Sequence, residues 1–135
     1  MATNKDFGLH GPPRLLLWNY SDEEKNQMDR FLAEVQAPPA VVIRKNQGYL
    51  SLEEIIHLDK SGNQEFDCDE KLVLFYNIPP KGISFLIDQS KQRQLPRPIY
   101  AAVTEESIHW PFHELMQDLI QEREAFRQMS PQKLL

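Results

Sequence analysis

Two histidines have the spacing of a metal site. His109 and His113 are four residues apart, which would place two ligands on one turn of a helix. Pro111 disfavours helical backbone at Trp110, so His109 falls outside the helix that follows. The two side chains then need not face the same way. The pattern favours polar histidines beside a helix start, and we predict no metal site.

Two residues have the chemical type of a nucleophile. Cys68 lies between Asp67 and Asp69, and neighbouring negative charge disfavours the thiolate that catalysis requires. Ser21 opens the sequence Ser-Asp-Glu-Glu, in which the serine caps a helix. The chain has no Gly-rich phosphate loop and no Gly-x-Ser-x-Gly turn. We therefore predict no catalytic residue and no cofactor, and favour a protein that is not an enzyme.

Polar and aromatic residues near the ends of apolar runs remain as candidates for binding. The segments 14–18 and 71–75 each contain a cation, three branched aliphatic residues and an aromatic residue. Such continuous apolar runs are typical of strands that are buried on both faces. The predicted ligand-binding residues are Asn19, Tyr20, Ser21, Tyr76, Asn77, Thr104, Ser107 and Trp110.

The elements that would position these residues occur twice, which indicates an internal duplication. In the first half, about 14–58, they are a strand over 14–18, a helix capped by Ser21, a strand over 40–43 and a short helix after Ser51. In the second half, about 71–126, they are a strand over 71–75, a helix opened by Pro79 and Pro80, a strand over 99–103 and a helix opened by Pro111. The apolar residues of the second helix, Ile83, Leu86 and Ile87, align with those of the first at an offset of 55 residues, whereas the strands align at 57. This predicts that the second strand–helix turn is about two residues shorter than the first.

The two halves are predicted to form one α/β domain over 14–126, with a loop at 59–70. The segments 1–13 and 127–135 are predicted to be mobile tails. A strand, a helix and a second buried strand imply a right-handed crossover between parallel strands. Two such β-α-β-α units can join through their first strands. This predicts a mainly parallel four-stranded sheet with the order 2-1-3-4 and helices on both faces.

A ferredoxin-like α+β arrangement with antiparallel pairs is the alternative fold. In the preferred fold the two first strands would end side by side, with a pseudo-twofold axis along the strands. Ligands of open α/β sheets bind beyond the carboxyl ends of strands, where the winding direction switches. We therefore predict a crevice between residues 19–21 and 77–79.

Composition limits the partners. The net charge is −5, and Lys91, Arg93 and Arg97 form the densest group of cations, which we interpret as a solvated helix end. This argues against nucleic acid, whose binding requires a basic surface. One cysteine excludes an internal disulfide, and no apolar run is long enough to cross a membrane. Residues 1–13 do not resemble a signal peptide, so the cytoplasm is the predicted compartment.

The second half resembles a bacterial family known as domain of unknown function 3783. The resemblance rests on Leu95-Pro96-Arg97, the strand end Ala102-Val103-Thr104, Trp110 and the helix that contains Glu114-Leu115. It extends to Asn19-Tyr20-Ser21 and Gly48-Tyr49-Leu50, and covers about Arg14 to Glu122.

This sequence departs from the family pattern at two positions. Ser107 stands where the family has asparagine, and Pro111 where it often has threonine. The family is uncharacterised, so the resemblance supports the architecture and implies no reaction.

Two functional hypotheses follow. The first is a non-catalytic binding or protein-interaction module, in which the last helix offers Met116, Ile120 and Phe126 to a second copy of the chain. The alternative is a small enzyme or a small-ligand sensor with its site at the carboxyl ends of the two central strands. His109, His113 or the turn 104–107 would then contribute polar groups.

Overall fold

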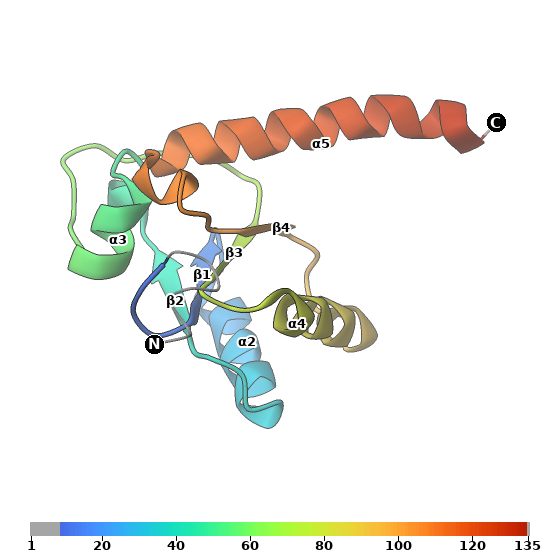
Figure 1. Cartoon of the computed structure of the whole chain (residues 1–135), viewed down its shortest axis with the longest axis horizontal. Helices are drawn as coiled ribbons and strands as arrows, with labels where there is room; N and C mark the ends of the chain where they lie inside the picture. The colour runs from blue at the N-terminus through green and yellow to red at the C-terminus, as the bar shows by residue number, and fades with distance from the viewer. Residues whose placement is uncertain (1–8, 135) are drawn as a thin grey trace. The chain divides into compact units, whose positions relative to one another are not determined.

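The chain divides into two compact units in a computed structural model that describes residues 9–134 (Figure 1). Within the described residues, the first unit comprises 9–44 and 67–106, and we call it the sheet unit. The second comprises 45–66 and 107–134, and we call it the helical unit. Each unit contains segments from both halves of the sequence.

The sheet unit contains four strands and two long helices. These are β1 (Arg14–Trp18), α2 (Asp22–Glu34), β2 (Ala40–Ile43), β3 (Leu72–Tyr76), α4 (Pro80–Gln92) and β4 (Ile99–Ala102). The strand order is β2-β1-β3-β4, and both outer pairs are parallel. The α/β fold, the strand order and the mainly parallel sheet are thereby confirmed.

The central pair is antiparallel, and the expectation of a parallel central pair is wrong. Trp18 lies opposite Leu72, and Arg14 lies opposite Tyr76. The crossover rule fixes strand direction only within a β-α-β unit, here β1 with β2 and β3 with β4. It does not determine the direction of a pair that joins the two halves. Because all side chains of β3 and nearly all of β1 are buried, no alternation in the sequence specifies that direction either.

Helices α2 and α4 pack on the same face of the sheet (Figure 1). Their buried side chains form one apolar cluster with the inward-facing side chains of β1 and β3. The cluster comprises Leu15, Leu17, Met28, Phe31, Leu32, Val73, Phe75, Ile78 and Leu86. Burial of this area is the main source of stability in the sheet unit.

The two strand–helix turns have the same length, 19–21 and 77–79, so the prediction of a shorter second turn is wrong. Asn19 and Asn77 each follow a strand and adopt left-handed backbone, with φ of 67° and 58°. Asparagine tolerates this conformation better than most residues. The predicted stripe of Ile83, Leu86 and Ile87 does face the core, with Leu86 buried and the two isoleucines partly buried. The prediction failed because β3 begins at Leu72, one residue later than expected, and because the stripe was aligned with the wrong residues of α2.

The helical unit contains two short 3₁₀ segments and two α-helices. These are η1 (Lys45–Gln47), α3 (Leu52–Leu58), η2 (Ser107–His109) and α5 (Phe112–Leu134). The predicted capping box of Ser51 and Glu54 is present at the start of α3. Reciprocal backbone hydrogen bonds join the two helix starts, from Leu52 N to Trp110 O (3.0 Å) and from Phe112 N to Leu50 O (2.8 Å).

Both predicted tails contain described residues with defined structure, and their mobility stays a prediction. Leu9 is only 4% exposed, although it falls within the predicted tail 1–13, and residues 1–8 lie outside the described part. Helix α5 continues to Leu134, through most of the predicted tail 127–135. No helix within residues 9–134 combines the length and apolar character needed to cross a membrane.

Candidate binding site

The predicted ligand residues that follow β1 and β3 lie at opposite ends of the sheet. Asn19, Tyr20 and Ser21 follow Trp18, which pairs with the first residue of β3, whereas Asn77 follows the last. The antiparallel ladder therefore separates the two turns, and a crevice shared by residues 19–21 and 77–79 is wrong.

At the end of β1, Lys71 holds the turn together. Its ammonium group donates hydrogen bonds to Asn19 O and Glu24 Oε1, both at 2.9 Å, and lies 5.2 Å from the centre of the Tyr20 ring. The Asn19 amide donates to Asp69 O at 2.7 Å. Ser21 caps α2, since its hydroxyl accepts from Glu24 N and its own N–H donates to Glu24 Oε1. These polar groups stabilise the connection between β1 and α2.

Two hydrogen bonds stabilise the charged form of the Glu24 carboxylate in this turn. The hydrogen bond from Ser21 N, reinforced by the hydrogen bond from Lys71, lowers the pKa of Glu24 from its usual 4.5. The carboxylate is thus ionised at neutral pH and serves as a structural acceptor.

Tyr20 has a buried hydroxyl group that finds no hydrogen-bond partner among residues 9–128. Burial raises the pKa of Tyr20 above its usual value, and the nearby Tyr100 and Glu24 add to the effect. Burial also raises the pKa of Tyr100, against a hydrogen bond with Ser90 that lowers it. Both phenols are therefore neutral at physiological pH, and their rings pack against the apolar cluster.

At the end of β3, the predicted residues hold the N-terminal segment. The Tyr76 hydroxyl donates to His10 O, and the Asn77 amide donates to Gly11 O at 2.8 Å. The Tyr76 ring is fully buried, with the Arg14 guanidinium 5.9 Å from its centre. Tyr76 therefore cannot offer its hydroxyl to a ligand without releasing residues 10 and 11.

The remaining predicted residues belong to two different units. Thr104 follows β4, and because β3 and β4 are parallel it lies at the same end of the sheet as Asn77. Ser107 and Trp110 belong to the helical unit, where Ser107 is buried at the start of η2 and Trp110 O accepts from Leu52 N. Binding by any of these eight residues stays a prediction.

The two histidines have separate environments within the helical unit. His109 is exposed, with its Nδ1 3.4 Å from Glu53 Oε1. The His113 ring instead lies 4.6 Å from the Tyr49 ring and 6.0 Å from the Phe66 ring, measured between centroids. In the described part of the chain, no three histidine, cysteine, aspartate or glutamate side chains form a group that could hold a metal ion.

Cys68 is a free, half-buried thiol. Its carbonyl oxygen accepts a hydrogen bond from Trp18 Nε1 at 3.2 Å. The residue thus positions the indole at the end of β1 through its backbone, a role that does not depend on the thiol.

A groove that the sequence does not predict lies on the sheet unit, between α2 and the segment that ends α4. It has a volume of about 210 Å³ and is lined by Gln27, Arg30, Phe31, Glu34, Arg93 and Leu95. A second hollow of about 310 Å³ lies along α2, lined by Asp29, Leu32, Ala33, Ala37 and Pro39. The one signal in the sequence was the basic group at Lys91, Arg93 and Arg97. It could not be connected with Arg30 before the packing of α2 and α4 was known.

Helix α5 carries an apolar stripe that becomes exposed toward its C-terminal end. Phe112, Met116, Leu119 and Phe126 share one face, at helical spacing. Phe112 and Met116 are fully buried, Leu119 is half-buried, and Phe126 is 62% exposed. Met116 was predicted to contact a second copy, and its complete burial in the folded chain makes that prediction wrong. Ile120 is half-buried, so it stays compatible with the prediction.

The fold and these surfaces define an α/β protein with a mixed four-stranded sheet. Residues 71–126 match the family described as domain of unknown function (DUF3783), which confirms the resemblance over that range. The extension of the resemblance to the first half stays a prediction. No curated protein and no solved structure matches the chain.

Proposed function

We propose that the protein is a non-catalytic interaction module that associates with a second copy of itself through the C-terminal half of α5. The observation that carries the proposal is the exposure of Phe126 at the end of an apolar stripe that is fully buried at its start. Leu119, which is half-buried, and Phe126 are seven residues apart and lie on the same face of α5. Burying one phenylalanine side chain contributes about 1.5–3 kcal/mol, and a twofold pair would bury two.

The exposed end of α5 also carries charges that are already paired within the helix. Arg127 lies 3.1 Å from Glu124, so these two charges add little to an interface with a second copy. The apolar face therefore carries the proposed association.

Analytical ultracentrifugation of the full chain over a range of concentrations tests this proposal. We expect a monomer–dimer equilibrium that Phe126→Asp shifts to monomer. Phe85→Asp is the matched control, because Phe85 is a 47% exposed phenylalanine on α4 and its replacement should leave the dimer intact.

A chain that stays monomeric at about 100 µM, well above the micromolar range of specific dimers, would contradict the proposal. A dimer that persists in Phe126→Asp would contradict it equally.

We also propose that the fold arose by duplication of one β-α-β-α unit. Supporting observations are the equal turns 19–21 and 77–79, the left-handed Asn19 and Asn77, and the left-handed Gln36 and Gln94 at the two helix ends. The members of each pair are separated by the same interval along the chain. As the compartment we propose the cytoplasm, in keeping with the single cysteine, Cys68, which forms no disulfide within the chain.

The alternative function does not receive the same support. An enzyme or ligand sensor was predicted to use a site common to the ends of β1 and β3. Those ends lie apart in the antiparallel pair, and their polar side chains hold backbone groups instead.

A further inference from the structure

The groove between α2 and the end of α4 combines an apolar floor with cationic walls. Phe31 is nearly buried and Leu95 half-buried, and they form the apolar part. Arg30 and Arg93 line the groove together with a single acid, Glu34, so the lining carries a net positive charge. This local sign is opposite to the −5 charge of the whole chain.

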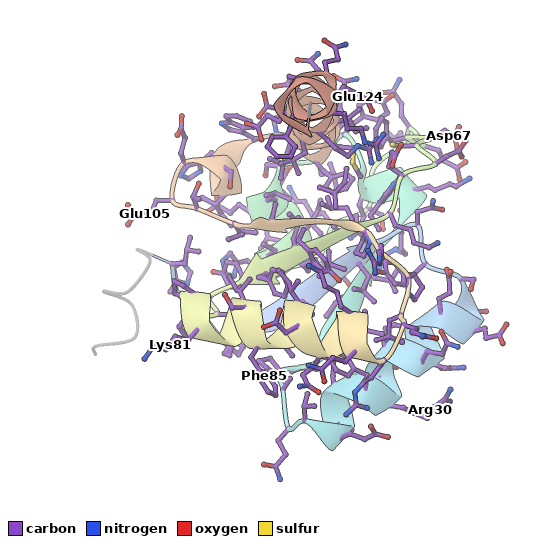
Figure 2. All side chains as sticks on the ribbon, turned by 90° about the vertical axis from the view of Figure 1, so that its right-hand side faces the viewer. Arg30, Asp67, Lys81, Phe85, Glu105 and Glu124 are labelled. Atoms are coloured by element: carbon purple, nitrogen blue, oxygen red, sulfur yellow. The ribbon has the colours of Figure 1, made fainter. Side chains whose placement is uncertain are left out.

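The two arginines have different roles. The Arg93 guanidinium lies 5.2 Å from the centre of the Phe31 ring and forms an ion pair with Glu34. These contacts fix its plane over the floor of the groove. Arg30 is exposed and forms no ion pair or hydrogen bond within residues 9–128. Its charge is therefore available to a ligand. Figure 2 shows Arg30 on the outer side of α2, at the end of the sheet unit away from Lys81.

The size of the groove selects the kind of ligand. Pockets for small-molecule ligands and cofactors have volumes of about 300–1,000 Å³, larger than the 210 Å³ found here. A groove of this size accommodates one large side chain. Two further exposed cations, Lys91 and Arg97, belong to the segment that forms this end of the unit and add to its positive field.

We propose that this groove binds an acidic peptide segment of a protein partner, with one branched aliphatic side chain as the anchor. The aliphatic side chain packs mainly on Leu95, because Phe31 is only 3% exposed and lies beneath the Arg93 guanidinium. A carboxylate next to the anchor pairs with Arg30, and further carboxylates are attracted by Arg93, Lys91 and Arg97. This surface is independent of α5, so the proposal does not depend on dimer formation.

The test is a nuclear magnetic resonance titration of the ¹⁵N-labelled full chain with the blocked peptide Asp-Glu-Leu-Glu-Asp. We expect shifts in the amide signals of Arg30, Glu34 and Leu95. The peptide Asn-Gln-Leu-Gln-Asn, which lacks charge, and the peptide Asp-Glu-Ala-Glu-Asp, which lacks the anchor, should each produce smaller shifts at the same amides.

Variants of one cation in the groove and one cation outside it supply the control. Arg30→Glu should weaken binding about tenfold, because it replaces an attraction by a repulsion at an exposed site on α2. Arg30→Lys should retain most of the affinity. Lys81→Glu makes a matching change of charge on an exposed residue at the start of α4, which does not line the groove, and should leave affinity unchanged.

Two outcomes would overturn the proposal. One is equal weakening by Arg30→Glu and Lys81→Glu, which would mean that the peptide responds only to overall charge. The other is stronger binding at the same amides by a single-stranded oligonucleotide than by the peptide, which would make the surface a phosphate-backbone site.

Discussion

Individual polar residues in this protein act mainly on its own backbone. The Asn19 and Asn77 amides, the Tyr76 hydroxyl and the Lys71 ammonium each donate to a backbone carbonyl oxygen. The acceptors lie in the turn after β1, in the segment before β3 and in the N-terminal segment. The sequence identified three of these four residues as ligand candidates because polar groups after buried strands occur both at binding sites and at structural turns. Here the antiparallel direction of β1 and β3, which separates the turns after them, favours the structural role over a shared binding site.

The carboxylate of Glu24 gives a prediction at the scale of one residue. Its pKa is lowered in the folded chain, so the unfolded chain binds more protons as the pH falls below 4.5. The stabilisation from Glu24 is therefore present above that pH and is lost as the pH falls toward the lowered folded value. The free energy of unfolding can be measured with urea at several pH values between about pH 6 and pH 3. It should fall less over this range in Glu24→Gln than in the unmodified chain.

Glu23→Gln is the matched control for this experiment. It removes an exposed carboxylate from the same helical turn and should leave the acid dependence of stability close to that of the unmodified chain. Equal effects of the two substitutions would mean that the hydrogen bonds from Ser21 and Lys71 do not stabilise the charged form of Glu24.

At the scale of elements, the sequence predicts the starts of helices well. The capping boxes at Ser21 and Ser51 and the proline pair at 79 and 80 are local signals, and the structure places helix starts at all three. The extension of α5 to Leu134 has no such local signal, because Pro131 is a residue typical of helix ends. The burial of Leu9 has none either, because a single apolar residue carries no periodicity.

The turn between β1 and α2 supports a prediction about one element. Asn19→Ala should lower the free energy of unfolding by about 1–3 kcal/mol, from the left-handed backbone and from the lost hydrogen bond to Asp69 O. Asn19→Gly should cost less, because glycine adopts positive φ without strain. Chemical denaturation of both variants measures the difference. Equal losses would show that the backbone conformation contributes nothing.

At the scale of the whole molecule, the groove and the central strand pair are features that the sequence did not predict. Each depends on contacts between segments far apart in the chain, such as Phe31 with Arg93 and Leu16 with Leu74. Helix and strand patterns describe which face of an element is buried, and they leave open which neighbour covers it. The strand order was predictable because each half forms its own crossover.

The strand order predicts a pattern of amide hydrogen exchange. Strands β1 and β3 have a neighbour on both sides, whereas β2 and β4 form the edges of the sheet. Amides of Leu16 and Leu74 should therefore exchange only through global unfolding, and amides of Val41 and Ala101 considerably faster. Exchange in β2 as slow as in β1 would contradict the assignment of β2 to an edge.

The antiparallel pairing of β1 with β3 has a consequence for ancestry and assembly. Its central pair is Leu16 with Leu74, and these two leucines hold the same position within their strands. An isologous interface between identical subunits has this same geometry, because each strand meets its counterpart about a perpendicular twofold axis. A single β-α-β-α unit would therefore be self-complementary, and fusing two such units in tandem would preserve the ladder. The family match, confined to residues 71–126, covers one such unit.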